Sequence, residues 1–117
     1  MAKLEVKNIK NPDELRTLPK TTGKILNIGE HTLMHGTFEP GWKWSECVKP
    51  KVGTKSCEVL HVLYVISGRM MLKMNDGTEK EFGPGDFGVV PPGHDAWVIG
   101  NENCVSLDFA AGKVYGK

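Results

Sequence analysis

The sequence lacks any long apolar run and any excess of one charge. No segment approaches the roughly 20 apolar residues that a membrane-spanning helix needs, and residues 1–20 contain no apolar core of a signal peptide. Fifteen Lys and Arg residues against fourteen Asp and Glu residues give a formal net charge of +1, and the lysines are scattered along the chain. The sequence therefore predicts a protein with neither a membrane nor a nucleic acid as its partner.

Cysteine is also scarce, with only Cys47, Cys57 and Cys104 in the chain. An odd number of cysteines without a secretion signal does not favour a disulfide framework, so we expect reduced thiols and a cytoplasmic location. A Ser/His/Asp constellation, a phosphate-binding loop and a dinucleotide fingerprint are absent from the sequence as well. Acyl, phosphoryl and hydride transfer therefore have no support in the sequence.

Glycine and proline, in contrast, are plentiful, with 14 and 7 residues among 117. They separate short apolar runs that alternate with a period of two, which indicates an all-β chain folded as one domain over residues 1–117, with a core over about 25–110. The predicted strands are 24–28, 32–39, 42–48, 57–66, 70–74, 79–82, 86–90, 96–99 and 104–109. The only predicted helix is a short N-terminal one over 12–18, because Asn11-Pro12-Asp13-Glu14 has the residue types of a helix start.

The most informative stretch is residues 83–94, in which a Gly-Pro-Gly-Asp turn leads into an apolar strand and a Pro-Pro-Gly corner follows it. Proline presets φ and glycine supplies positive φ, so the chain turns sharply at both ends of this strand. His94 comes directly after the second corner. A histidine in this position can face the interior of a closed β-structure, where it would be available to bind a ligand.

Residues 57–66 carry a second set of candidate side chains. Strand alternation places Cys57 and His61 on the same face, together with Val59, Leu63 and Val65. Four residues of straight strand span about 13 Å, whereas two ligands of one zinc ion lie roughly 3.5 Å apart. Metal binding by Cys57 and His61 therefore requires a bend or bulge between them.

Residues 41–109 resemble the two sequence motifs of the cupins, which are small β-barrel proteins of the jelly-roll type. Gly85, Pro91 and Gly93 match the glycine, proline and glycine of the second cupin motif at the right spacing, and Gly68 matches the closing glycine of the first. The run 62–68 is typical of the strand and turn that end the first motif. The resemblance implies a cupin-type double-stranded β-helix (jelly-roll) barrel that often pairs as a homodimer through its edge strands.

The resemblance also bears on metal ligands. His61 falls on the glutamate position of the first motif, and the two histidine positions before it fall on Lys55 and Cys57. With Gly41 as the opening glycine, Cys47 takes the first histidine position instead. The histidine of the second motif falls on Ala96, and His94, two residues earlier on the same strand face, can substitute for it. The candidate metal ligands are therefore His61, His94, Cys57 and Cys47, and this set of N and S donors favours zinc over iron, manganese or nickel.

Two main functions follow as expectations. In the first, the chain binds a small molecule in its cavity, with or without a divalent metal, and catalyses no defined reaction. In the second, it is a metal-dependent cupin enzyme of the oxygenase or isomerase type that uses His61 and His94. A third, weaker hypothesis is a thiol redox sensor formed by Cys57 and Cys47. Trp42, Trp44 and Trp97 are candidates for lining the ligand pocket, and Asp95 is a candidate for orienting His94.

Overall fold

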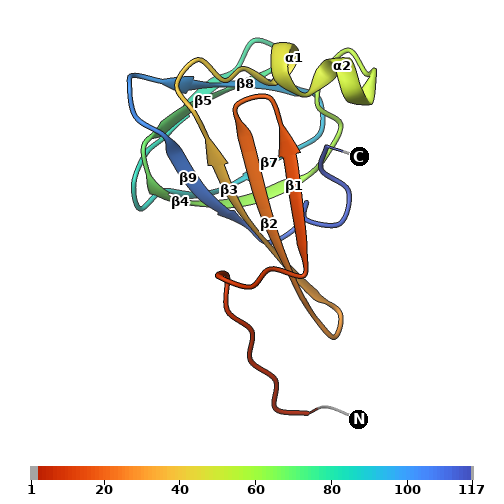
Figure 1. The fold of residues 1–117 in the computed structure, drawn as a ribbon. Helices are drawn as coiled ribbons and strands as arrows, with labels where there is room; N and C mark the ends of the chain where they lie inside the picture. Colours follow the sequence, from red (N-terminus) through yellow and green to blue (C-terminus); the bar gives the residue numbers. More distant parts are fainter. Residues whose placement is uncertain (1–2, 117) are drawn as a thin grey trace.

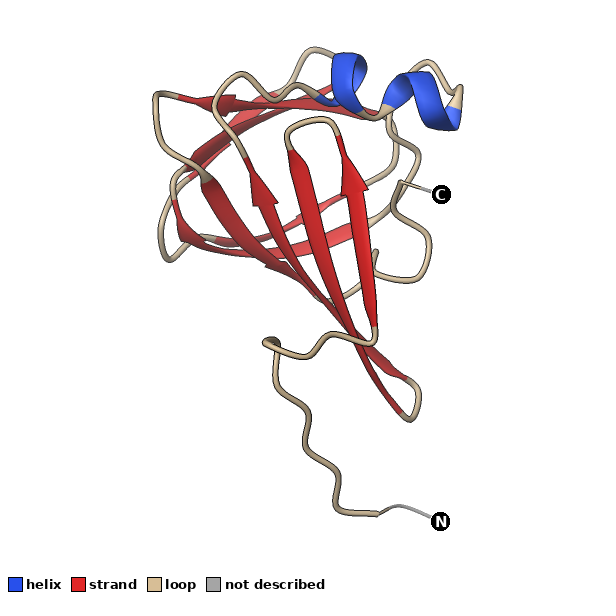
Figure 2. Ribbon diagram, in the orientation of Figure 1, coloured by secondary structure: helices blue, strands red, loops and turns tan. Residues whose placement is uncertain are grey.

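Strands dominate the fold of residues 3–116, which are the residues that the computed structural model describes (Figures 1 and 2). In chain order the described strands are β1 (Glu14–Leu18), β2 (Thr21–Ile28), β3 (His31–Phe38), β4 (His61–Ser67), β5 (Arg69–Met74), β6 (Glu79–Phe82), β7 (Phe87–Val90), β8 (His94–Ile99) and β9 (Cys104–Asp108). Two short helices, α1 (Trp44–Cys47) and α2 (Lys49–Val52), lie between β3 and β4. Neither is long and apolar enough to cross a bilayer.

The strands form two antiparallel sheets. The larger sheet has the order β1-β2-β3-β9-β4-β7, and the smaller has the order β6-β5-β8. Buried side chains of both sheets pack in one apolar core, to which Met34 and Leu63 contribute from the larger sheet and Leu72 and Ala96 from the smaller. The predicted all-β class is confirmed. Within residues 3–116, however, no strand ladder joins the two sheets into a closed barrel.

The predicted N-terminal helix over 12–18 is wrong, because this segment forms β1. Leu15 lies opposite Lys24 of β2, and the backbone N–H of Asp13 donates to the carbonyl of Ile25 at 2.8 Å. The Asp13 carboxylate, which looked like part of a helix start, accepts hydrogen bonds from the backbone N–H of Asn27 and from Lys7. Pairing with β2 therefore overrides the local helix signal.

The predicted strand 42–48 is also wrong, because most of it is helical. Trp44, Cys47 and Val48 are buried, and their spacing of i, i+3 and i+4 is that of a helix with one face in the core. The helix α2 then ends at Gly53, whose φ of 78° is the left-handed conformation typical of a helix end. Figure 1 shows both helices at one end of the two sheets.

The predicted strand 57–66 is only partly formed, and its irregular start positions the site. The strand β4 begins at His61, whereas Cys57 forms an isolated bridge to His94 at the start of β8. The backbone N–H of Cys57 donates to the carbonyl of His94 at 2.7 Å, and that of Gly93 donates to the carbonyl of Cys57 at 2.7 Å. The chain therefore leaves the smaller sheet at Cys57 and joins the larger one at His61.

Candidate metal centre

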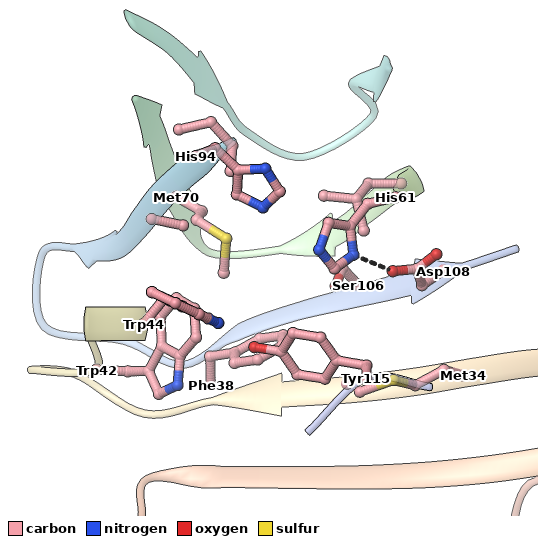
Figure 3. Close-up of a pocket in the computed structure, with 14 residues that line it drawn as sticks. Met34, Phe38, Trp42, Trp44, His61, Met70, His94, Ser106, Asp108 and Tyr115 are labelled. Atoms are coloured by element: carbon pink, nitrogen blue, oxygen red, sulfur yellow. Dashed lines mark hydrogen bonds and ion pairs between the residues drawn. The ribbon is translucent and has the colours of Figure 1, made fainter. Parts of the chain in front are cut away.

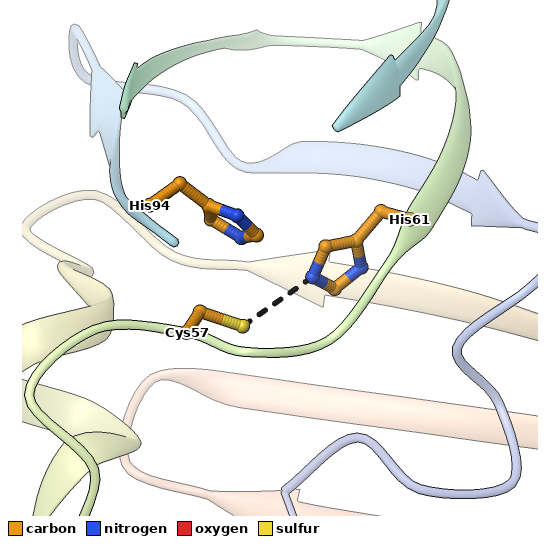
Figure 4. A group of neighbouring side chains, drawn as sticks. All are labelled: Cys57, His61 and His94. Carbon is orange, nitrogen blue, oxygen red and sulfur yellow. Dashed lines mark hydrogen bonds between the residues drawn. The ribbon is translucent and has the colours of Figure 1, made fainter. Parts of the chain in front are cut away.

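Cys57, His61 and His94 come together in the interior (Figure 4). One ligand atom from each lies within 4.8 Å of the other two, and all three residues are buried. The Sγ of Cys57 is 3.5 Å from the Nε2 of His61, and the rings of His61 and His94 have centroids 5.1 Å apart. The departure from a straight strand between Cys57 and His61 makes this approach geometrically feasible.

His94 is held by the corner that precedes it. Its Nδ1 donates to the backbone carbonyl of Pro91 at 2.7 Å. Because a carbonyl can only accept, Nδ1 carries a hydrogen, and Nε2 of the neutral ring keeps a lone pair. The positive φ of Gly93 (95°) lets the chain make this corner.

His61 is held in the same way by a carboxylate. Its Nδ1 lies 2.6 Å from the Oδ2 of Asp108 at the end of β9, and both side chains are buried. Burial lowers the pKa of His61, but the hydrogen bonds and charges of Asp108 and Cys57 outweigh this effect and raise that pKa to about 9. Burial likewise raises the pKa of Asp108, but His61 and the backbone N–H groups of Ala110 and Ala111 hold it below its usual range.

Cys57 is the acidic partner of this group. Burial raises the pKa of its thiol, yet a hydrogen bond from His61, together with the charge of His61, lowers that pKa to about 6. The buried thiolate of Cys57 and the buried imidazolium of His61 therefore stabilise each other between about pH 6 and 9 in the metal-free protein.

A narrow, apolar cavity lies beside these side chains (Figure 3). Its volume is about 30 Å³, which is room for little more than one or two water molecules in this conformation. His61 and His94 line one side, and the other walls are mostly apolar: Met34, Phe38, Trp42, Trp44, Leu63, Met70, Leu72, Ala96 and Tyr115. The walls therefore offer few polar groups besides the two histidines, Ser106 and Asp108.

Several other candidates lie elsewhere. Cys47 is buried in α1 and is not part of the group formed by Cys57, His61 and His94. Trp97 does not line the cavity, and Lys43 lies over its ring with Nζ 5.5 Å from the centroid. Asp95 does not orient His94, because its carboxylate accepts from the backbone N–H groups of Ser45 and Ala96. Trp42 and Trp44 do line the cavity, as expected.

Two residues of the site, Asp108 and Tyr115, were not predicted from the sequence. Alternation along β9 places Asp108 on the same face as the buried residues Cys104 and Ser106, so a carboxylate on an interior face was a usable signal. Tyr115 lies beyond the last strand, and its ring meets that of His61 edge-on at 5.4 Å. No periodicity in the sequence indicates that this residue turns back into the core.

No family model and no curated protein sequence matches this chain. Solved structures do match it. The polyketide cyclase RemF from Streptomyces resistomycificus is 20% identical with a TM-score of 0.65, over 92% of this chain and 79% of that one. A cupin-like protein (tm1010) from Thermotoga maritima is 19% identical with a TM-score of 0.54, over 77% of this chain and 67% of that one.

The third structure, oxalate decarboxylase from Lactobacillus farciminis, is 16% identical with a TM-score of 0.62. The match covers 87% of this chain but 32% of that one, so this chain spans about a third of that protein's length. At these identities the likenesses show the fold alone. The chain has the fold of the cupin superfamily, as its sequence motifs indicated.

Proposed function

We propose that this protein is a small cupin that binds one divalent metal ion through Cys57, His61 and His94 and holds a small molecule beside it. The observation that supports this most directly is the meeting of three buried ligand atoms within 4.8 Å of one another. Metal-binding histidines commonly donate their second ring nitrogen to a carboxylate or a backbone carbonyl. Here His61 does the first and His94 the second.

The distances are close to those that a tetrahedral zinc site needs. Bonds of about 2.3 Å to sulfur and 2.0–2.1 Å to nitrogen place an S and an N ligand about 3.6 Å apart. Cys57 Sγ and His61 Nε2 are already 3.5 Å apart. Side-chain adjustments of about 1 Å would bring the third ligand into range. One thiolate and two imidazoles favour zinc, whereas iron, manganese and nickel usually take harder or more numerous ligands.

The small molecule would lie on the side of the metal that faces the apolar cavity. Three protein ligands leave a fourth position for water or a ligand. The cavity of about 30 Å³ admits only a small group in this conformation, and a larger ligand would have to displace flexible side chains such as Met34 and Met70.

A metal-dependent enzyme of the oxygenase or isomerase type is the second candidate. One open position on the metal, enclosed by apolar walls, is the arrangement of catalytic zinc sites, where the metal polarises a bound substrate. Two proteins of similar fold, a polyketide cyclase and an oxalate decarboxylase, are enzymes. His61 and His94 would hold the metal in both candidate functions, so the site itself is common to them.

Metal analysis of the purified, metal-supplemented protein tests the proposal. We expect about one zinc per chain, and its loss in His61→Ala and in His94→Ala. Cys57→Ser should lose the metal as well. Cys47→Ser is its matched control and should keep the metal, because Cys47 is a buried cysteine outside the group. Substoichiometric metal in the folded wild type, or full metal content in His94→Ala, would contradict the proposed site.

We also propose a cytoplasmic homodimer. The three cysteines are free thiols, which suits a reducing compartment. The strand β7 lies at the edge of the larger sheet, and its Phe87 and Val89 are 65% and 60% exposed beside the half-exposed Tyr64 and Ile66 of β4. A second copy that covers this apolar face would remove a strand edge and exposed aromatic surface from water.

A further inference from the structure

A second hollow, which we call the outer groove, adjoins the metal cavity. It has a volume of about 200 Å³ and is lined mainly by Val48, Val52, Thr54, Glu58, Val59 and Val114. The groove and the metal cavity share two walls, Trp44 and Tyr115. Cys57 lines the groove, whereas His61 and His94 line the cavity. The proposed metal ligands therefore lie where the two spaces adjoin.

Tyr115 is the shared wall that belongs to the C-terminal segment. Its side chain is buried, with 4% of the residue exposed, and its ring lies against His61 with its hydroxyl turned toward Trp44 (Figure 3). Among residues 3–116 the Tyr115 hydroxyl has no hydrogen-bond partner. A phenol hydroxyl donates a hydrogen bond, so that of Tyr115 can bind an acceptor on a ligand.

Single hydrogen bonds and turns, rather than a strand ladder, hold the segment that carries Tyr115. The Oδ1 of Asp108 accepts from the backbone N–H groups of Ala110 and Ala111 at 3.0 Å each, and Arg16 Nη1 donates to the Tyr115 carbonyl at 2.7 Å. The backbone N–H of Phe109 donates to the carbonyl of Val62 in β4, and those of Val114 and Tyr115 donate to the carbonyl of Ala111. Between these anchors Val114 is 55% exposed. A short segment held by turns, without a strand ladder along its length, opens at less cost than a strand of either sheet.

We propose that Tyr115 is a gate between the two spaces, and that a monocarboxylate with a short apolar chain binds across it. This inference rests on the proposed metal site. The carboxylate takes the open position on the metal and accepts a hydrogen bond from the Tyr115 hydroxyl. The chain lies in the outer groove against Val48, Val52 and Val59.

The chemistry of the walls selects this class of ligand. An open position on the metal binds an electron-pair donor. The Tyr115 hydroxyl donates a hydrogen bond to an acceptor on the same head group of the ligand. The valine side chains of the groove favour a hydrocarbon chain over a second polar group. A volume of about 200 Å³ suits a chain of a few carbons rather than a long acyl tail.

The test uses the Co²⁺-substituted full chain, whose absorption spectrum reports both thiolate ligation and changes at the open position. Acetate, butyrate and hexanoate are the probes. Each methylene that enters the groove should raise the affinity about fourfold, so hexanoate should bind at least about tenfold more tightly than acetate. Val52→Trp, which fills the groove, should abolish this difference without loss of cobalt, whereas Val89→Trp on the outer face should keep it.

The gate is tested by the rate at which a chelator removes cobalt. Tyr115→Ala should speed removal at least about tenfold, because a gate that is open less than a tenth of the time slows exchange by that factor. Tyr64→Ala removes the other tyrosine of the chain from the outer surface and should leave the rate unchanged. Tyr115→Phe should weaken carboxylate binding while the dependence on chain length persists.

The outcomes separate this inference from the proposed function. Absence of the thiolate-to-cobalt band would contradict the metal site, and the gate with it. Normal cobalt binding with equal affinities for acetate and hexanoate would overturn the groove inference and leave the metal site standing. A cobalt spectrum that hexanoate leaves unchanged would also overturn the groove inference and leave the metal site standing. Release of cobalt from Tyr115→Ala at the wild-type rate would overturn the gate.

Discussion

The Cys57→Ser substitution should make the stability of the metal-free protein strongly dependent on pH. In the wild type, His61 has its pKa raised from 6.5 to about 9, and Cys57 has its pKa lowered from 9.0 to about 6. The stabilisation from His61 is complete below pH 6.5 and is lost as the pH rises through about 9. The stabilisation from Cys57 is complete above pH 9 and is lost as the pH falls through about 6.

These two effects cancel between about pH 6.5 and 9. In this window the unfolded chain holds one proton on the thiol of Cys57, and the folded chain holds one proton on His61. Because both states bind the same number of protons on this pair, the free energy of unfolding gains no pH dependence from it. The pair instead transfers a proton from sulfur to nitrogen when the chain folds.

Cys57→Ser removes the sulfur contribution and leaves His61 beside Asp108. The folded variant then holds one proton more than the unfolded chain, so its free energy of unfolding should fall by up to about 1.4 kcal/mol per pH unit above pH 6.5. Without the thiolate the pKa of His61 is also less elevated, so the fall should end below pH 9.

Urea denaturation in the presence of a chelator and a reductant, at half-unit steps from pH 6.5 to 9, measures this dependence. Cys104→Ser is the control, because burial raises the pKa of the Cys104 thiol to about 11 and neither state ionises it below pH 8. Its profile between pH 6.5 and 8 should be flat, as in the wild type, at a lower overall stability. A flat profile for Cys57→Ser, or a wild-type profile as steep as that predicted for the variant, would refute the proton transfer.

Three other predictions concern the carboxylate beside His61, a turn and the outer surface. Asp108→Asn places an amide against Nδ1 of His61 and disfavours the lone pair on Nε2, so zinc affinity in a chelator competition should fall about 10- to 100-fold, whereas Asp95→Asn should retain it. Gly68→Ala should cost about 1–3 kcal/mol more in urea denaturation than Gly77→Ala, because both residues have positive φ but only a Cβ at residue 68 would overlap the Asn103 carbonyl; equal costs would contradict this. Phe87→Asp should convert a dimer to a monomer in size-exclusion chromatography with light scattering, and a wild type that elutes as a monomer would contradict the proposed interface.

The sequence predicted the fold class well, because corners and alternation are local signals. The corners at Gly85 and Gly93 and the turn at Gly77 all have the positive φ that their residue types suggest. The errors arose where partners distant in sequence decide the conformation. Pairing with β2 makes residues 14–18 a strand, and the core position of Trp44 makes residues 44–47 a helix.

The candidate site could likewise be predicted from local sequence patterns, but not where residues distant in sequence contribute to it. The motif comparison pointed to His61, His94 and Cys57, and these side chains meet in the structure. It also pointed to Cys47, which is not part of the group. Asp108 and Tyr115 reach the site from the C-terminal part of the chain. They contact His61, from which they are 47 and 54 residues away in the sequence, and no local pattern encodes contacts at such separations.

The position of the site between the two sheets explains why its geometry depends on the irregular segment 58–60. Cys57 is tied by backbone hydrogen bonds to the start of β8, which belongs to the smaller sheet, whereas His61 and Asp108 belong to neighbouring strands of the larger one. A ligand shared by Cys57, His61 and His94 would therefore link the two sheets at a place where no ladder within residues 3–116 joins them. In the metal-free protein the thiolate and the imidazolium supply part of that link, because their attraction acts across the same gap. A metal ion bound by these three side chains would replace the proton of His61 with a cation at a place where the two sheets already lie close together.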